Sequence, residues 1–276
     1  MSKISAADVK KLRDLTGAGM MDCKKALAEA NGDIEKAIEE LRKKGQKLSA
    51  KRADRDANEG VVIAITSDDN TTGIVVRLGC ETDFVAKNED FIKLAQSFAD
   101  IALNNKPADL DALLALPYEN ITVGEKVIEQ VGVIGEKVEI SAYGIVEAPM
   151  VTPYIHAGYK AGVVVGFNKA SDNFTTAGKD VAMQIAAMSP IAVNEAGVDS
   201  SVIEKEIEIG KEQARAEGKP EQMLERIAEG KLKKFFKERT LLNQVFVKDS
   251  KQTIASYLQS EDSDLTVTDF KHVTLG

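Results

Sequence analysis

Hydrophobic positions in the first 45 residues recur at the spacing of short helices. A capping-box pattern at Ser5 and Asp8 precedes the first run of apolar residues, and two glycines within TGAGMMDC (16–23) break that run. A second short helix follows, and NGD (31–33) ends it and caps a third. We therefore expect residues 1–45 to form a three-helix module of the ubiquitin-associated kind.

The pattern then changes from helical spacing to short β-branched runs. Residues 46–59 are polar and basic with few large apolar side chains, so we expect a linker that is at most partly helical. Beyond it, GVVIAIT (60–66) and GIVVRLGC (73–80) flank a polar turn, which predicts a β-hairpin. An apolar stripe over residues 91–102 predicts a helix after the hairpin.

A similar order of strands and helix returns later in the chain. Strands are expected within 139–157 and at 161–170, followed by a helix over 180–188 and a last strand within 265–275 that closes a second sheet. We predict an α+β fold with two related core subdomains, at 60–137 and 138–276. Two charged helices with narrow apolar seams predict an antiparallel coiled-coil insertion at about 198–238.

Composition and charge narrow the class of protein. The chain is 43% hydrophobic and 29% charged, and no apolar run reaches the roughly 18–20 residues of a membrane span. The N-terminus lacks the apolar core of a signal peptide, so we expect a cytoplasmic protein. Residues 1–55 carry 14 Lys and Arg against 9 Asp and Glu, although the whole chain has a net charge of −8. Cys23 and Cys80 lie far apart, and we expect both to be reduced and buried.

Candidate catalytic motifs fail on their context. The glycines in 17–22 resemble part of a dinucleotide fingerprint but lie between helices with no preceding strand. Residues 132–137 lack the order of a phosphate-binding loop, and the two histidines provide no metal cluster of the usual spacing. We therefore expect no enzymatic activity, no cofactor, no metal and no direct nucleotide binding.

Two long motifs carry a family resemblance. CETDFVAKNEDF (80–91) and LTGAGMMDCKKAL (15–27), together with the order of elements from Val9 to about Lys271, resemble the elongation factor Ts family. These proteins are guanine-nucleotide exchange factors of elongation factor Tu. The resemblance implies a translation factor that binds elongation factor Tu with GDP, accelerates GDP release and allows GTP to reload.

The resemblance also implies roles for particular residues. Thr82, Asp83, Phe84 and Val85 would enter the GTPase near its magnesium and phosphate site, with Phe84 as a wedge and Asp83 displacing elements that hold the metal. An aromatic ring exposed in the free protein and buried in a complex suits this role. Without the resemblance, Phe84 would more often cover the edge of its own core.

The N-terminal module would contact another face of the GTPase domain. Met20 and Met21 are flexible apolar groups suited to such a surface, and Arg13 and Lys24 could meet acidic groups. Methionines are also common in cores, but neighbouring residues rarely face the same way, so we expect at least one of the two to point outward.

The second half of the chain holds further matching positions. Gly135 and His156 lie in stretches that match the family, although a lone histidine is more often structural. Phe246 and Val247 match a segment that in the family contacts the third domain of the partner, so the resemblance implies the same contact here, and Lys248 is a polar departure from that segment. The charged helices are either a family accessory or a solvated protrusion. Many members carry a further C-terminal helical module that is absent from this sequence, so its contacts are not transferred.

Two other classes of function remain open at this point. One is RNA binding, in which phosphates would be contacted by the basic residues Lys47, Lys51, Arg52 and Arg55. The rest of the chain is acidic, and the basic segment has no interleaved aromatic residues for stacking on bases, so a nucleic-acid partner is not expected. An adaptor built on the three-helix module is the other alternative, and it leaves the 80–91 motif unexplained.

Overall fold

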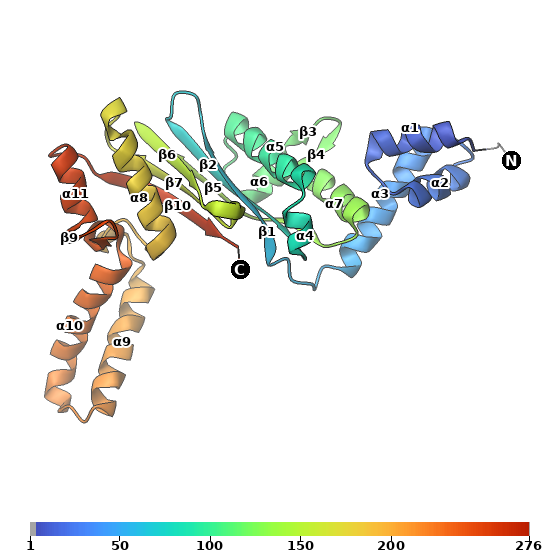
Figure 1. The fold of residues 1–276 in the computed structure, drawn as a ribbon. Coiled ribbons are helices and arrows are strands. Elements are labelled where there is room, and N and C mark those ends of the chain that lie inside the picture. Colours follow the sequence, from blue (N-terminus) through green and yellow to red (C-terminus); the bar gives the residue numbers. More distant parts are fainter. Residues whose placement is uncertain (1–3, 276) are drawn as a thin grey trace.

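The computed structural model describes residues 4–275, which run from a helical module at one end, through two central sheets, to a helical hairpin at the other (Figure 1). The module contains α1 (Ala6–Thr16), α2 (Met20–Glu29) and α3 (Ile34–Lys51). The predicted capping box is present, because the Ser5 hydroxyl accepts the Asp8 N–H at 3.1 Å and the Asp8 carboxylate accepts the Ser5 N–H at 3.1 Å. The shared core of the module consists of Val9, Leu12, Ala18, Cys23, Ala26, Leu27, Ala30 and Ala37.

The third helix is longer than the hydrophobic pattern indicates. It continues to Lys51, so the first part of the segment expected to be a linker, 46–59, is helical. Leu41, Gly45 and Leu48 share one face of α3, and Gly45 is buried against α7 (Val123–Ile134). A glycine contact leaves no apolar side chain to recognise, which is why the sequence pattern suggested a linker.

The first sheet contains three antiparallel strands in the order β1 (Glu59–Thr66), β2 (Thr72–Cys80) and β5 (Val138–Glu147). The predicted hairpin at 60–80 is therefore confirmed. The sheet is covered by α5 (Glu89–Asn105) and α7, whose apolar faces share one core with it. The short elements between these two helices are α6 (Leu110–Ala115), β3 (Pro117–Tyr118) and β4 (Ile121–Thr122).

The strand β5 lies in a different sheet from the one that the sequence suggested. The expected boundary between the subdomains at 137/138 precedes β5, but β5 pairs along its length with β2 of the first sheet. The second sheet has the order β10 (Val267–Thr274), β7 (Ala161–Phe167) and β6 (Met150–Ile155). A connection of only two residues joins β5 to β6, so the chain changes sheet at a sharp bend that resembles a hairpin turn in the sequence.

The two sheets pack face to face, with helices on both outer faces (Figure 1). In β1, Val61 and Ile63 point to the core under α5 and α7, whereas Val62 and Ala64 point to the second sheet. Burial on both faces explains why strands of these sheets read as continuous apolar runs. The outer face of the second sheet is covered by α8 (Thr175–Met188) and α11 (Ile254–Glu261).

The charged insertion forms a helical hairpin of α9 (Ser200–Ala216) and α10 (Glu221–Arg239) that projects from the second sheet (Figure 1). The helices approach closely, because a Cβ atom placed on Gly210 would lie 3.1 Å from the Cα of Ala228. After α10 the chain forms the short hairpin β8 (Val245–Phe246) and β9 (Asp249–Thr253). Within residues 4–275 there are also four 3-10 turns: Ala157–Tyr159, Asp172–Phe174, Glu195–Gly197 and Leu241–Asn243.

Candidate partner-binding sites

An exposed aromatic ring stands on a short, anchored turn between β2 and α5. Thr82 caps the four-residue helix α4 (Asp83–Ala86), and its hydroxyl accepts the N–H of Val85 at 3.5 Å. Ala86 is buried and Val85 packs against the first core, but Phe84 has 84% of its surface exposed. A single exposed apolar side chain is common on protein surfaces, but here the anchored neighbours of Phe84 hold its ring outward.

The turn is fixed from behind by the end of α7. Gly135 ends this helix with a left-handed φ of 81°, which turns the chain so that Glu136 faces Thr82. One carboxylate oxygen of Glu136 accepts the Thr82 hydroxyl at 2.8 Å, and the other accepts the Thr82 N–H at 3.1 Å. Two bonds to one carboxylate fix both the side chain and the backbone of the capping residue.

A second carboxylate holds the residue before the turn. Glu81 accepts hydrogen bonds from Arg52, from Arg55 at 2.9 Å and from the N–H of Lys137 at 2.6 Å. Desolvation raises the pKa of Glu81, but the three donors outweigh it and lower that pKa to about 2. Three segments distant in sequence therefore meet at this one side chain.

The residues beside Phe84 carry opposite charges. Lys87 donates to the carboxylate of Asp83 at 2.6 Å, one helical turn apart. This hydrogen bond lowers the pKa of Asp83, whose side chain is half exposed.

The buried thiol of Cys80 donates to the Thr82 carbonyl at 3.2 Å. Burial, followed by the charge of Glu136, raises the pKa of this thiol to about 12.

The predicted contact residues of the N-terminal module lie together at its surface. Met20 and Met21 are 60% and 73% exposed at the start of α2, so both point outward, where at least one was expected to. With the exposed side chains of Arg13 and Lys24 they line a groove of about 530 Å³ between α1 and α2. The groove therefore combines apolar methionines with basic groups.

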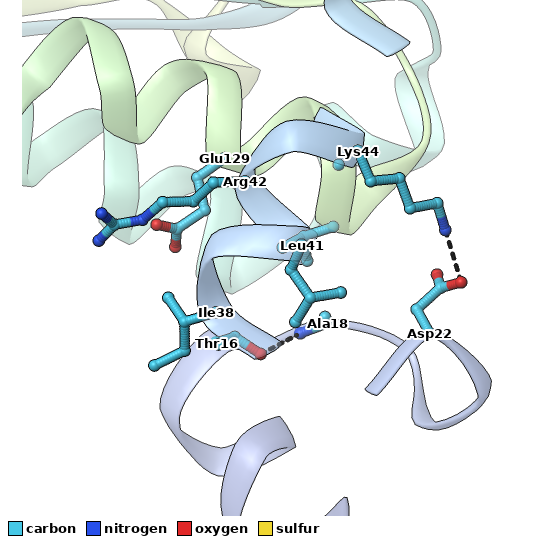
Figure 2. A pocket seen from close by; sticks show the side chains of 10 residues that line it. Thr16, Ala18, Asp22, Ile38, Leu41, Arg42, Lys44 and Glu129 are labelled. Atoms are coloured by element: carbon cyan, nitrogen blue, oxygen red, sulfur yellow. Dashed lines mark hydrogen bonds and ion pairs between the residues drawn. The ribbon is translucent and has the colours of Figure 1, made fainter. Parts of the chain in front are cut away.

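The module contacts the core through a seam between α3 and α7, which Figure 2 shows from close by. Its lining residues come from the end of α1 and the turn after it, from α2, from α3 and from α7. Across the neighbouring edge Lys44 of α3 pairs with Asp22 of α2 at 2.5 Å. The module that carries the methionine groove therefore packs, through α3, on α7, and the chain just after α7 holds the Phe84 turn.

The remaining predicted residues divide between surface and core. His156 is exposed after β6, and its Nδ1 lies 3.0 Å from the Tyr154 hydroxyl. Val247 is 50% exposed, but the expected contact residue Phe246 is only 4% exposed and stacks on Tyr257 at 4.4 Å between ring centroids. Phe246 is therefore a core residue, because in an extended segment neighbouring side chains face opposite ways.

The structure also adds exposed apolar residues that sequence reasoning missed beside Val247. Val245 is exposed, and both Val245 and Val247 are bonded through their backbones to Gln184 of α8. Met188 and Ile191 are exposed just beyond Gln184. The alternation of apolar residues at 245, 246 and 247 could have indicated this arrangement, since in an extended segment Val245 and Val247 face one way and Phe246 the other. The polar departure Lys248 is explained by its ion pair with Asp180, at 2.6 Å.

Other kinds of site were also sought in the described part of the chain. Across residues 4–275 no three His, Cys, Asp or Glu side chains are grouped so that they could hold a metal ion. No helix in the same range is long and apolar enough to cross a membrane. The coarse prediction of a mixed α+β fold is confirmed.

Comparison with known proteins gives one consistent family. Residues 81–276 match the family model described as elongation factor TS. The chain is 56% identical to an elongation factor Ts of Christiangramia forsetii over 276 residues, with full coverage of both chains. It is 53% identical to an elongation factor Ts of Flavobacterium psychrophilum, again with full coverage of both, and 48% identical to one of Porphyromonas gingivalis over 274 residues, covering 99% of this chain and 98% of the relative. The chain therefore belongs to the elongation factor Ts family, whose members act in translation elongation and protein biosynthesis.

Proposed function

We propose that this protein binds elongation factor Tu in its GDP state and accelerates GDP release by inserting the turn of Thr82–Val85 into the GTPase. Family membership supports the partner, and one observation supports the mechanism. Phe84 is 84% exposed, although the residues on both sides of it are anchored. A fixed, exposed aromatic ring is suited to enter a pocket of another protein.

Nucleotide exchange of this kind needs no covalent chemistry. The factor must bind the nucleotide-free partner more tightly than the nucleotide-bound partner, and by linkage the nucleotide then weakens binding of the factor to the same degree. A side chain that enters near the magnesium and phosphate site supplies such a difference. A side chain that only holds the partner changes affinity without changing the rate of release.

The proposed contacts fall into two groups along the molecule. The methionine groove of α1 and α2, with Arg13 and Lys24, holds one face of the GTPase domain, while Phe84 and Asp83 act at its metal site. The ion pair of Asp83 with Lys87 opens when Asp83 approaches the elements that hold the magnesium ion. Val247, with the apolar residues beside it, the exposed His156 and the partly exposed Gly135 provide further contacts.

The test is release of a fluorescent GDP from purified elongation factor Tu, chased with excess unlabelled GDP, at increasing concentrations of this protein. We expect faster release that saturates. Phe84→Ala should lower the maximal rate by roughly 30-fold, the factor for a contact of about 2 kcal/mol, with a smaller change in the half-saturating concentration.

Met223→Ala is the matched control, because Met223 is also a large exposed apolar residue but lies on the helical hairpin. It should leave the maximal rate unchanged. No acceleration by the wild-type protein, with an active partner and a known exchange factor as positive control, would refute the proposed function. An unchanged maximum for Phe84→Ala would remove Phe84 from the mechanism.

The alternative of RNA binding through the basic segment receives less support. Arg52 and Arg55 both bind Glu81, so two of the four basic residues expected to contact phosphates are engaged with a carboxylate of this chain.

A further inference from the structure

Two glutamates behind the exposed turn have no role in the contacts proposed above. Glu136 and Glu81 lie outside the hydrophobic cores, yet each accepts hydrogen bonds from separate parts of the chain. Their partners are the backbone and hydroxyl of Thr82 for the first, and two arginines and the Lys137 N–H for the second. Such concentrated bonding around one surface turn requires an explanation.

We infer that Glu136 and Glu81 are positioning residues for nucleotide exchange: they fix the Thr82–Val85 turn from behind, so that Phe84 meets the partner as a rigid projection. The inference rests on the proposed function. Neither carboxylate touches the partner in this scheme, and both act through Thr82 and the chain on either side of it.

Stiffness matters because the turn and the partner push on each other equally. If the turn is free to yield, insertion of Phe84 bends the turn and leaves the metal site of the partner undisturbed. If the turn is fixed, the partner must deform. A mobile turn would also have to be ordered in the step in which Phe84 enters the partner and the nucleotide leaves, which costs conformational entropy in that step.

The backbone and the side chain of Thr82, the residue that caps the turn, are both held by hydrogen bonds. The Thr82 N–H and hydroxyl are both bonded to Glu136, at 3.1 and 2.8 Å, so that neither rotation of the side chain nor tilting of the peptide is free. One residue earlier, the largely buried Glu81 is bonded on both oxygens. The direction in which Phe84 leaves the backbone is therefore set before any partner arrives.

The same bonds connect the turn to the N-terminal module. Arg52 and Arg55 lie in the first four residues after α3, the helix of the module that packs on α7, and Lys137 lies three residues after the last residue of α7. Glu81 thus joins the chain leaving α3 to the chain leaving α7. The N-terminal module and the turn are therefore joined by hydrogen bonds to the same side chain.

The test uses Glu136→Ala and Glu136→Gln in the GDP-release assay with elongation factor Tu. The alanine variant removes both bonds to Thr82, and the glutamine variant keeps the shape but has an amide where one acceptor was. We expect Glu136→Ala to lower the maximal rate by about tenfold, the cost of ordering roughly one residue, with little change in the half-saturating concentration. Glu136→Gln should fall between Glu136→Ala and wild type.

Glu125→Gln is the matched control. Glu125 also accepts a threonine N–H, from Thr122 at 2.8 Å, but at the opposite end of α7. It should lower stability as much as Glu136→Gln does, with an unchanged maximal rate. Circular dichroism establishes that each variant is folded.

A double-mutant cycle separates positioning from general destabilisation. In a Phe84→Ala background the loss of Glu136 should have almost no further effect on the maximal rate, since no ring remains to be positioned. Independent, multiplying effects would overturn the inference, as would an unchanged maximum for Glu136→Ala. If the wild-type protein does not accelerate GDP release at all, the proposed function itself is refuted. If the wild type accelerates release and Phe84→Ala lowers the maximal rate, an unchanged maximal rate for Glu136→Ala refutes the positioning role alone.

Discussion

The crossing of α3 and α7 offers a sharp test of how the N-terminal module is attached to the core. Gly45 lies in the middle of α3, and a Cβ atom added there would lie 3.0 Å from the carbonyl oxygen of Ile128. A Cβ atom on Gly132 of α7 would lie 3.0 Å from the Cα of Gly45. The two backbones are therefore in contact, and Gly45→Ala must push them apart.

The expected magnitude follows from a comparison with a second glycine. Gly230 lies in the middle of α10 with nothing within 4 Å of an added Cβ atom, so Gly230→Ala should stabilise by about 1 kcal/mol through helix propensity alone. Gly45→Ala gains the same propensity but adds an overpacking cost of about 1–3 kcal/mol. The difference between the two variants, about 1–3 kcal/mol, therefore measures the steric cost at the crossing.

The assay is denaturant unfolding of both variants, together with hydrogen exchange of the α7 amides. We expect Gly230→Ala to raise the free energy of unfolding, and Gly45→Ala to lower it or leave it unchanged while accelerating exchange in α7. Equal stabilisation by the two substitutions would refute the reasoning, since it would show that α3 and α7 are not pressed together.

Three further predictions concern stability and its pH dependence. In the folded protein Glu81 has a pKa of about 2, below its ordinary value of 4.5, so its contribution to stability is present above pH 4.5 and is lost as the pH falls toward 2. In denaturant titrations over that range, the free energy of unfolding of the wild type should fall by about 1–2 kcal/mol relative to that of Glu81→Gln. This figure allows for the screening of Arg55 by solvent. Phe246→Ala should destabilise by about 3–5 kcal/mol, whereas Val247→Ala should cost about 0.5 kcal/mol or less; similar losses would contradict the burial of Phe246. Gly135→Ala has open space but a φ of 81°, so thermal unfolding should show a loss of about 1 kcal/mol, and an unchanged midpoint would show that the left-handed turn is dispensable.

Local signals in the sequence were sufficient for most individual elements. The capping box at Ser5, the hairpin at 60–80 and the last strand of the second sheet depend on near neighbours or on apolar runs, and the structure contains all three. The outward position of Met20 and Met21 was only half predicted, because a helix start after Gly19 exposes both.

The features that could not be predicted depend on contacts between distant segments. The placement of β5 beside β2 is decided by pairing across more than 50 residues, and a short bend before β6 obscured it. The bonds of Arg52 and Arg55 to Glu81 span 29 and 26 residues, and no local pattern distinguishes such arginines from solvated ones. The same limit applies to Glu136, which appeared in the sequence only as the neighbour of a matching glycine.

The free energy gained by burying the exposed ring of Phe84 can be compared with the free energy that nucleotide exchange requires. Full burial of an aromatic side chain removes about 150–250 Å² from water, which is worth about 4–6 kcal/mol before the cost of association. Coupling between two ligands of one protein is commonly about 1–3 kcal/mol. One aromatic ring can therefore offset the strain imposed on a partner, provided that its own support does not yield. In the proposed mechanism this condition gives the carboxylates behind the turn a role beyond stability, and it accounts for an exposed ring on a turn that two glutamates hold from behind.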